Sequence, residues 1–450
     1  MRNATFPRGG IHPPDRKRRT RDIAAWNAIL PRTSIVPLLQ HTGRPARACV
    51  HAGDRVREGQ LVGRAEAGES ANVHAPIPGI VREIRSILLP GGDRTDAVVI
   101  DMEGEFDRLG KQLPAHEWQS LDPAALLRLI REHGVVGMGG VPTPTHRSLK
   151  LSRDGRCETL VLNGAESEPY LCADHRLMVE RPHAVLTGAR IIGRAVGAAS
   201  IIVAIEANKP AAIAAMSAAA REASVADTRA APATDVRIVR LRVKYPQGDE
   251  RQLVRAVTGH EIPTGGTAAD VQTVTTGVAT ASAVYDAVVY HQPLVERIVT
   301  VAGGAVANPA NIKVRIGTPV SELIAECGGF GATPAKVVLG GPMTGHTVDD
   351  LATPVSKSTR GIIALTRREV HPAPQTPCIQ CGRCVEACPM GLNPTRLAKL
   401  IEHGQVAAAV DEGLFDCTEC GACGYICPSR IPLVERMRRG KAAAGRDVLG

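Results

Sequence analysis

The run C-I-Q-C-G-R-C-V-E-A-C-P at residues 378–389 is matched in pattern by C-T-E-C-G-A-C-G-Y-I-C-P at residues 417–428. Both follow C-x2-C-x2-C-x3-C-P, and together they hold eight of the chain's twelve cysteines. Three close thiolates can hold one face of a cubane iron–sulfur cluster, and in two-cluster ferredoxins the fourth cysteine of each run ligates the other cluster. The sequence therefore predicts two [4Fe–4S] clusters, with the ligand sets Cys378, Cys381, Cys384 and Cys427 for one and Cys417, Cys420, Cys423 and Cys388 for the other.

Structural zinc and disulfides are the competing interpretations of these cysteines. Zinc takes four ligands and can use C-x2-C pairs, but it has no use for a third cysteine two residues further on. Disulfides need an oxidising compartment, and no signal peptide is evident in the sequence. Four other cysteines lie outside any ligand spacing and are expected to be small buried residues: Cys49, Cys157, Cys172 and Cys327.

The segment between the two cysteine motifs predicts helices. Leu397, Leu400 and Ile401 recur at helical spacing within residues 394–403, and residues 405–410 continue the pattern. We therefore expect residues 371–450 to form a helical, ferredoxin-like domain. Because such a domain moves single electrons, the rest of the chain should contain what it connects to.

The composition favours a protein of several domains with acidic partners. At 450 residues the chain has room for about three domains, and its formal net charge is +9. A positive surface attracts acidic proteins, anionic lipid and phosphate-bearing cofactors. Nucleic acid is not expected as a partner, because no groove-reading motif is present. The most apolar stretch, residues 186–205, contains Arg190 and Arg194 and predicts a core helix and strand, with no transmembrane segment.

The N-terminal third predicts an arm followed by a β domain. Prolines and glycines interrupt residues 1–45, which are expected to form an irregular basic arm whose charged run at 16–21 is solvated. Residues 46–119 alternate short β runs with turns and resemble the barrel-sandwich fold of biotinyl and lipoyl carrier domains. The expected hairpin tip at residues 69–72 has no lysine for a swinging arm, so a docking domain is predicted.

The middle of the chain predicts an α/β domain with a mostly parallel sheet. Asp122 and Pro123 have the chemistry of a helix cap and first helical residue. Strand and helix patterns then alternate, which favours parallel strands. The expected elements are strand 159–162, helix 182–196, strand 199–205, helix 210–222, strand 236–243 and helix 250–257. Polar loops that follow strands lie where open α/β sheets bind ligands.

Residues 296–345 predict a small β-rich unit with turns at Gly303-Gly304 and Asn308-Pro309. Residues 346–370, rich in Pro, Thr and Ser, are expected to form a linker to the cysteine-rich domain. The α/β domain is accordingly predicted to occupy residues 120–295.

Several segments resemble the C subunit of the Rnf electron-transport complex, an ion-translocating ferredoxin:NAD oxidoreductase. The resemblance runs almost end to end, and its most specific segments are N-G-A-E-S-E-P-Y (163–170), I-E-A-N-K-P (205–210), K-Y-P-Q-G-D-E-R-Q-L (244–253) and L-G-G-P-M-T-G (339–345). That subunit is similar to the NADH-binding flavoprotein of respiratory complex I. The resemblance implies a multidomain α/β fold with a barrel-sandwich hybrid, an α/β domain for FMN and NADH, a β-grasp (soluble-ligand-binding) unit and a helical module with two [4Fe–4S] clusters.

By motif position, the resemblance also implies site residues. Loop glycines would let the backbone approach the FMN phosphate and ring. The implied flavin and nicotinamide residues are Gly137, Gly139, Gly140, Asn163, Glu166, Glu168, Tyr245, Gly248 and Glu250, with Glu168 as the catalytic residue. A flavin suits this position because NAD exchanges two electrons as hydride, clusters exchange one, and a flavin does both.

The chain departs from the family pattern in this pocket. Pro142 stands for a glycine, Thr143 for an aromatic residue, Ser148 for a lysine, and Gly277 for an asparagine. One interpretation is that FMN still binds with altered affinity; the other is that the chain is a flavin-less, cluster-bearing conduit and scaffold. A cobalamin reductase is similar in its parts, but its barrel-sandwich unit is expected after the flavin domain.

The expected function is therefore electron transfer between ferredoxin and NAD through two [4Fe–4S] clusters and FMN. The resemblance implies a peripheral subunit on the cytoplasmic side of the inner membrane. Its expected partners are the other subunits of an Rnf-type complex and, directly or through them, ferredoxin.

Overall fold

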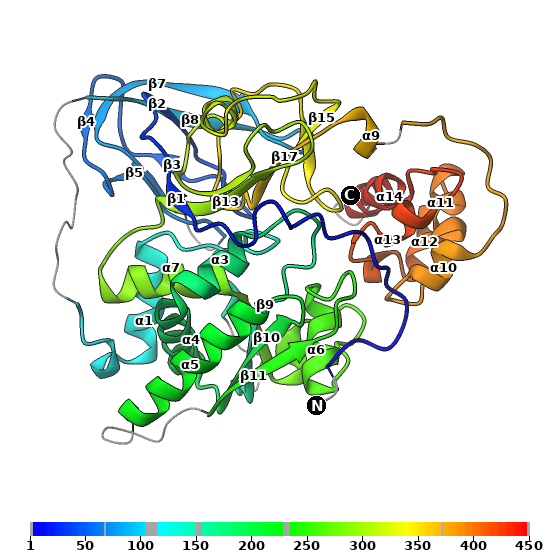
Figure 1. Ribbon diagram of the computed structural model, residues 1–450, viewed down its shortest axis with the longest axis horizontal. Coiled ribbons are helices and arrows are strands. Elements are labelled where there is room, and N and C mark those ends of the chain that lie inside the picture. Colours follow the sequence, from blue (N-terminus) through cyan, green and yellow to red (C-terminus); the bar gives the residue numbers. More distant parts are fainter. Residues whose placement is uncertain are drawn as a thin grey trace.

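Figure 1 shows the computed structural model of the chain, which describes residues 3–66, 69–103, 115–149, 155–227, 235–370 and 372–447. Along the sequence it contains two small sheets (blue), an α/β domain (cyan to green), a six-stranded sheet (largely yellow-green and yellow) and a helical module (orange to red). The helical module lies at one end of the molecule.

Two small sheets formed by residues 33–102 pack together. One has the strand order β2-β8-β7-β4 and the other β3-β5-β6, and Val36, Val62 and Val98 share their buried cluster. The strands are β2 Thr33–Pro37, β3 Arg47–Ala48, β4 Arg55–Val56, β5 Leu61–Arg64, β6 Val73–His74, β7 Gly79–Leu88 and β8 Arg94–Met102. The prediction that residues 1–45 form an irregular arm is wrong at β2, because this strand pairs with β8 and buries Val36 in the sandwich.

The α/β domain contains a four-stranded sheet in the order β11-β10-β9-β12, in which every pairing is parallel, as predicted. Its strands are β9 Thr159–Gly164, β10 Ser200–Glu206, β11 Asp235–Leu241 and β12 Thr273–Gly277. Its helices are α1 Pro123–Glu132, α2 Thr145–Ser148, α3 Ala173–Glu180, α4 Pro182–Val196, α5 Pro210–Asp227, α6 Glu250–Thr258 and α7 Val278–Val289, with short 3₁₀ turns at Trp118–Ser120 and Ala268–Val271. The Asp122 side chain caps α1 by accepting a hydrogen bond from the Ala125 amide, as expected.

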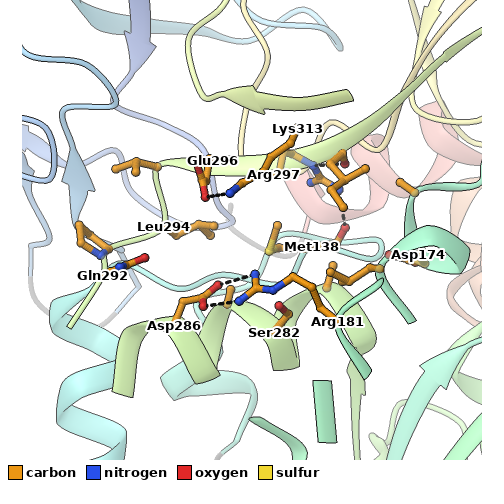
Figure 2. Close-up of a pocket in the computed structure, with 17 residues that line it drawn as sticks. Met138, Asp174, Arg181, Ser282, Asp286, Gln292, Leu294, Glu296, Arg297 and Lys313 are labelled. Carbon is orange, nitrogen blue, oxygen red and sulfur yellow. Dashed lines mark hydrogen bonds and ion pairs between the residues drawn. The ribbon is translucent and has the colours of Figure 1, made fainter. Parts of the chain in front are cut away.

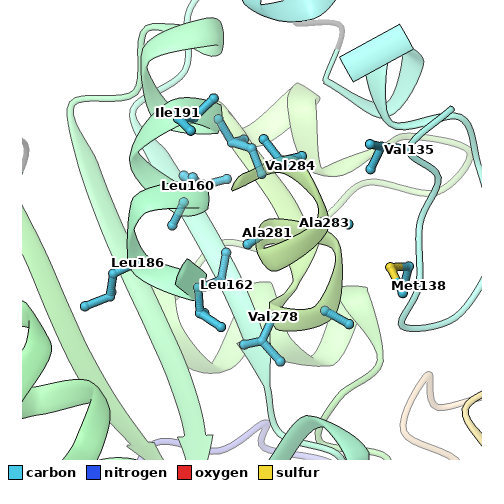
Figure 3. Close-up of a cluster of buried hydrophobic side chains, with 14 of the residues drawn as sticks. Val135, Met138, Leu160, Leu162, Leu186, Ile191, Val278, Ala281, Ala283 and Val284 are labelled. Atoms are coloured by element: carbon cyan, nitrogen blue, oxygen red, sulfur yellow. The ribbon is translucent and has the colours of Figure 1, made fainter. Parts of the chain in front are cut away.

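The core of this domain lies between the sheet and helices α4 and α7 (Figure 3). Leu160 and Leu162 of β9, Leu186 of α4 and Val284 of α7 belong to one buried cluster. Burying each such side chain contributes about 1.5–3 kcal/mol. The apolar residues 186–205 thus form a core helix and strand, as predicted. In the described ranges, no helix combines the length and apolar character that crossing a membrane requires.

The six-stranded sheet has the order β1-β14-β13-β17-β15-β16. Its strands are β1 Trp26–Asn27, β13 Glu296–Ala302, β14 Ala310–Arg315, β15 Lys336–Leu339, β16 His346–Val348 and β17 Gly361–Leu365, with helices α8 Val320–Glu326 and α9 Arg367–Val370 nearby. The predicted linker at 346–370 is therefore wrong in part. G-I-I-A-L at β17 is entirely buried and pairs with both β13 and β15, so it completes the sheet.

The C-terminal module is helical, as predicted. Its helices are α10 Arg383–Ala387, α11 Pro394–Glu402, α12 Val406–Asp411, α13 Ala422–Ile426 and α14 Leu433–Asp447, with a 3₁₀ turn at Leu414–Asp416. Leu397, Leu414, Leu433 and Met437 form its small core, and several motif cysteines pack around that core.

The N-terminal segment connects the α/β domain to the helical module (dark blue in Figure 1). The Ala4 amide bonds the Arg240 carbonyl beside β11, the Gly10 amide bonds the Ala387 carbonyl of α10, and Ile11 exchanges two backbone hydrogen bonds with Tyr245. Lys17 was predicted to be solvated, but it is buried. Its ammonium group donates a hydrogen bond to the Glu166 carbonyl at 2.5 Å. Phe6, Ile11 and Thr20 are buried as well, whereas the other basic residues of the run, at positions 16, 18, 19 and 21, are exposed as predicted.

Candidate flavin edge and iron–sulfur sites

The carboxyl ends of β9 and β12 form the edge of the α/β sheet where a ligand is expected to bind. The chain runs outward from β9 to β10 and β11, then returns to place β12 on the other side of β9. Asn163 at the end of β9 pairs with Gly277 at the end of β12. Open α/β sheets bind ligands at such a topological switch point. We call this edge, with the loops at residues 137–141, 163–170 and 245–248, the switch edge.

The loop glycines bring backbone close to the switch edge. A Cβ on Gly277 would stand 3.7 Å from the Gly139 Cα, so the two backbones lie side by side there. A Cβ on Gly140 would meet no atom within 4 Å, which leaves open space beside its backbone. Gly137 has a local reason to be glycine, because its Cβ would lie 2.8 Å from the Val141 carbonyl oxygen. The Met138 amide is held by the Thr280 hydroxyl of α7 at 3.0 Å.

Asn163 and Gly248 meet at this edge. The Asn163 amide group donates to the Gly248 carbonyl at 2.8 Å, and its side-chain oxygen accepts from the Ala165 amide at 3.1 Å. Gly248 lies against Ser167, whose hydroxyl accepts a hydrogen bond of 3.4 Å from the Gly248 amide. The structure therefore joins two of the polar loops that the sequence singled out.

Glu166 turns away from the switch edge into the protein. Its carboxylate accepts hydrogen bonds from the amides of Asp174 at 2.7 Å and His175 at 3.3 Å, at the start of α3. Lys17 and Lys209 donate to its carbonyl oxygen at 2.5 and 3.5 Å. Burial raises the pKa of Glu166 to about 7, although the nearby Lys17 opposes the shift. These contacts tie α3 and the N-terminal segment together.

Glu168 is also buried and has both carboxylate oxygens occupied. One accepts from the Met343 amide at 3.0 Å, and the other accepts from the Thr344 hydroxyl at 2.5 Å. Gly341 leaves room for the carboxylate, since a Cβ there would lie 2.3 Å from the Glu168 Cδ. Glu168 thereby holds the loop at residues 340–345, and its predicted catalytic role stays a prediction.

Tyr245 links the α/β domain to the second cysteine motif. Its hydroxyl donates to the Cys420 carbonyl at 2.6 Å, and its ring is buried with Ile11 and Ala422. Burial raises the pKa of Tyr245, and the carboxylate of Glu168 raises it further. Glu250, the first residue of α6, accepts a hydrogen bond from the Thr275 hydroxyl of β12.

Pro142, Thr143 and Ser148 lie in and just after the 137–141 loop. The backbone carbonyl of Pro142 accepts a hydrogen bond from the Thr42 amide at 3.1 Å, and that of Thr143 accepts from the Gly137 amide at 2.8 Å. The Ser148 hydroxyl donates to the Thr145 carbonyl of its own helix at 3.0 Å. The side chain at this position is therefore neutral and bonded within α2.

The crossed ligand set predicted for the second cluster lies around one pocket. That pocket is lined by sulfur-bearing residues of both motifs, namely Cys388, Cys417, Cys420 and Cys423. Burial raises the pKa values of Cys420 and Cys423 to about 12, and neighbouring thiols, including Cys388, add to the rise. Iron would remove this penalty by binding the thiolate form.

The first cluster site has corresponding neighbours. Burial raises the pKa of Cys384, and the nearby Cys427 of the other motif adds to the shift. Cys381, by contrast, is exposed. No three His, Cys, Asp or Glu side chains in the described ranges surround a single-ion site. Zinc would require sulfurs about 2.3 Å from one ion, whereas a cubane cluster separates its four thiolates by a cage of iron and sulfide.

The four remaining cysteines do not share one environment. Cys157, Cys172 and Cys327 are buried, as expected. Cys49 is exposed, so the prediction of a buried residue is wrong there. It lies beside a short strand at the edge of the sandwich, and its thiol donates to the Leu61 carbonyl at 3.4 Å.

A cavity of about 90 Å³ lies between the α/β domain and the six-stranded sheet (Figure 2). Arg181 of the loop before α4 makes two hydrogen bonds to Asp286 of α7, at 2.7 and 3.0 Å. Across the cavity, Glu296 of β13 pairs with Lys313 of β14 at 2.6 Å. Sequence reasoning did not single out this site, because its charges come from distant segments and follow no local motif.

Comparison with known proteins agrees with this architecture. Models of four families match in succession: the RnfC barrel sandwich hybrid domain at 5–105, the Nuo51 FMN-binding domain at 130–286, the SLBB domain at 298–347 and the 4Fe-4S dicluster domain at 374–431. The chain is 40% identical over 90% of its length to the C subunit of the proton-translocating ferredoxin:NAD(+) oxidoreductase complex of Clostridium ljungdahlii, of which it covers 86%. The chain belongs to the family of C subunits of ion-translocating oxidoreductase complexes.

Two other members of this C-subunit family show the same relationship. The C subunit of the Rhodobacter capsulatus ion-translocating oxidoreductase complex is 41% identical over 96% of this chain and 82% of its own length. The C subunit of the Na(+)-translocating ferredoxin:NAD(+) oxidoreductase complex of Acetobacterium woodii is 37% identical, covering 89% of this chain and 88% of the relative. A structure of an NAD+-reducing [NiFe]-hydrogenase shares the fold, with a TM-score of 0.55, 18% identity and coverage of 74% of this chain and 64% of the hydrogenase chain.

Proposed function

We propose that this chain is the peripheral subunit that passes electrons between NAD(H) and ferredoxin in an ion-translocating membrane complex, on the cytoplasmic side. Three relatives in the C-subunit family support the type of complex, and two of them are named for the ferredoxin:NAD(+) reaction. The observation that carries the proposal is the hydrogen bond between Tyr245 and the Cys420 carbonyl, because it joins the switch edge directly to a cluster ligand.

FMN fits the switch edge as far as the backbone is concerned. The open side of Gly140 and the close pair Gly139 and Gly277 leave backbone accessible, and Asn163 and Gly248 fix the facing loop. These residues would hold the cofactor; Tyr245 would support it from the side of the clusters. When bound, FMN supplies the exchange between a two-electron hydride and single electrons. Glu166 and Glu168 would act by holding the surrounding loops, given their present contacts.

The arrangement gives the two clusters an order. The cluster on Cys417, Cys420, Cys423 and Cys388 would lie nearest the switch edge, because Tyr245 contacts Cys420. The other cluster would lie further out, where Cys381 is exposed. Electrons entering at the flavin would therefore reach the buried cluster first and the exposed cluster second.

A flavin-less conduit is the second candidate, and Ser148 favours it. Its hydroxyl bonds within α2, so the position that would counter a phosphate carries no cation. Anaerobic purification followed by iron, sulfide and flavin assays on one sample separates the two. We expect about eight irons and about one FMN per chain. Eight irons without flavin, even after FMN is added, would establish the conduit, and zinc in place of iron would contradict both.

A further inference from the structure

We infer that the exposed face of the first cysteine motif is the docking surface for an acidic iron–sulfur protein that exchanges electrons with the outer cluster. This inference rests on the proposed function, since it names the surface through which that electron transfer leaves or enters the chain. The surface is defined by Ile379, Arg383, Val385, Tyr425 and Arg430, around the exposed Cys381, and we call it the outer face.

The outer face gathers apolar side chains that a folded chain usually covers. Ile379 is 67% exposed, Tyr425 51% and Val385 38%. Val385 and Tyr425 lie on α10 and α13, which pack against each other, and Ile379 precedes α10 in the same motif. Exposed apolar groups in one place mark interaction sites, and aromatic and arginine side chains are enriched at the centres of such sites.

The position of this face beside a cluster ligand indicates a redox partner. Cys381 is the one exposed thiol among the eight motif cysteines, all of which the structure describes. The ligands of the inner cluster are covered instead, by Tyr245, by the N-terminal segment next to Cys388 and by Met343, whose carbonyl would lie 2.8 Å from a Cβ on Gly421. A protein that must approach the outer cluster closely therefore meets it through the outer face.

The charges of the outer face favour an acidic partner. Arg383 and Arg430 are exposed, and neither guanidinium forms an ion pair with a carboxylate of the described residues, whereas Glu386 is the one acid in residues 378–388. Other arginines of the module do pair, as Arg396 does with Glu412. Two such guanidinium groups around an electron-carrying site would attract a partner whose own cluster is ringed by carboxylates.

The partner is expected to bind weakly and transiently. Electron-transfer encounters use interfaces below about 1,200 Å². Their association is steered by charge, so the rate should fall as salt increases. A second copy of this chain fits less well, because the same positive face would meet itself.

The test uses the full-length holoprotein and an acidic two-[4Fe–4S] ferredoxin, with reduced ferredoxin driving NAD+ reduction. Reversing both charges, with Arg383→Glu and Arg430→Glu together, should raise the KM for ferredoxin about tenfold or more at low salt and reverse the direction of its salt dependence, because salt then screens a repulsion. A second variant, Ile379→Ser with Tyr425→Ser, should raise that KM at all salt concentrations. NADH oxidation by ferricyanide, which needs no docking surface, should remain within about twofold.

Two control variants make the same kinds of substitution at exposed positions outside the cysteine-rich module. Arg128→Glu on α1 reverses an exposed charge, and Leu88→Ser removes an apolar side chain that is 58% exposed on β7. Neither should change the ferredoxin KM by more than about twofold. Electron paramagnetic resonance of the dithionite-reduced samples should show both clusters in every variant.

The outcomes separate the docking surface from the proposed function. If wild-type protein oxidises NADH with ferricyanide but the outer-face variants keep an unchanged ferredoxin KM, the inference is overturned and the proposed function stands. A mass that falls from dimer to monomer in the Ile379 and Tyr425 variant would overturn it in favour of self-association. If the wild-type protein with eight irons and FMN cannot oxidise NADH at all, the proposed function itself has failed.

Discussion

The two cysteine motifs share one sequence pattern but lie in different surroundings. The ligands of the second cluster, which come from the motif at 417–428 and from Cys388, are enclosed: Tyr245 bonds the Cys420 carbonyl, Met343 covers Gly421, and the Gly10 amide bonds the Ala387 carbonyl just before Cys388. The motif at 378–389 exposes Cys381 and Ile379. Because burial and hydrogen bonds to the ligands tune cluster potential, two equal motifs become two different electron carriers.

The largest expected effect separates the clusters by ligand. Cys420→Ser should remove the enclosed cluster, lowering iron from about eight to about four per chain and stopping electron flow from NADH to the other cluster. Cys381→Ser should also lose about four irons, yet leave NADH able to reduce the enclosed cluster. Iron assays and electron paramagnetic resonance after NADH addition measure both. Equal behaviour of the two variants would contradict the order of the clusters.

Glu168→Gln tests how strongly Glu168 holds the loop at residues 340–345, which covers the second cysteine motif at Gly421. The amide can accept only one of the two hydrogen bonds that the carboxylate accepts from Met343 and Thr344, so we expect a loss of about 2 kcal/mol in stability. Glu386→Gln, at an exposed acid of the first motif, should change stability by under about 0.5 kcal/mol. Thermal unfolding of the holoproteins measures both. Loss of NADH oxidation at an unchanged Tm would instead support the predicted catalytic role.

A pair of glycines at equivalent positions sharpens the comparison. Gly421 and Gly382 both have positive φ, +83° and +74°, so alanine strains either one by about 1–2 kcal/mol. A Cβ on Gly421 would also lie 2.8 Å from the Met343 carbonyl, whereas a Cβ on Gly382 would meet no atom within 4 Å. Gly421→Ala should therefore cost about 1–3 kcal/mol more than Gly382→Ala in denaturant unfolding. Equal costs would show that Met343 can move aside.

The smallest expected effect is a difference in acid sensitivity at another equivalent pair, Glu419 and Gln380. Burial would raise the pKa of Glu419, but hydrogen bonds from Lys441 and Arg438, at 3.0 and 2.9 Å, lower it below 4.5. A lowered carboxyl pKa stabilises the folded state above the unfolded value, and this contribution is lost as pH falls through the folded value. Glu419→Gln should flatten stability between about pH 3 and 5. Gln380→Glu, with no such cations at hand, should not add a matching slope.

Much of this protein was determined by sequence, because the relevant chemistry is local. Ligand spacing in each cysteine motif follows from the geometry of one cluster. The cap at Asp122 and the alternation of strands and helices from residue 159 onward likewise depend on neighbours in the chain, and the structure confirms both. The segments matched to the family were sufficient to identify the order of the domains.

Tertiary structure decided what distant segments do to one another. Nothing in the sequence of the polar loop distinguishes Glu166 from Glu168. In the folded chain Glu166 contacts Lys17, whereas Glu168 contacts Met343. Folding likewise buries Lys17 from a charged run, draws β17 from an expected linker into a sheet, and leaves Cys381 as the one exposed thiol of two equal cysteine motifs. Such outcomes depend on contacts between residues far apart in sequence, whose burial and charge no local pattern encodes.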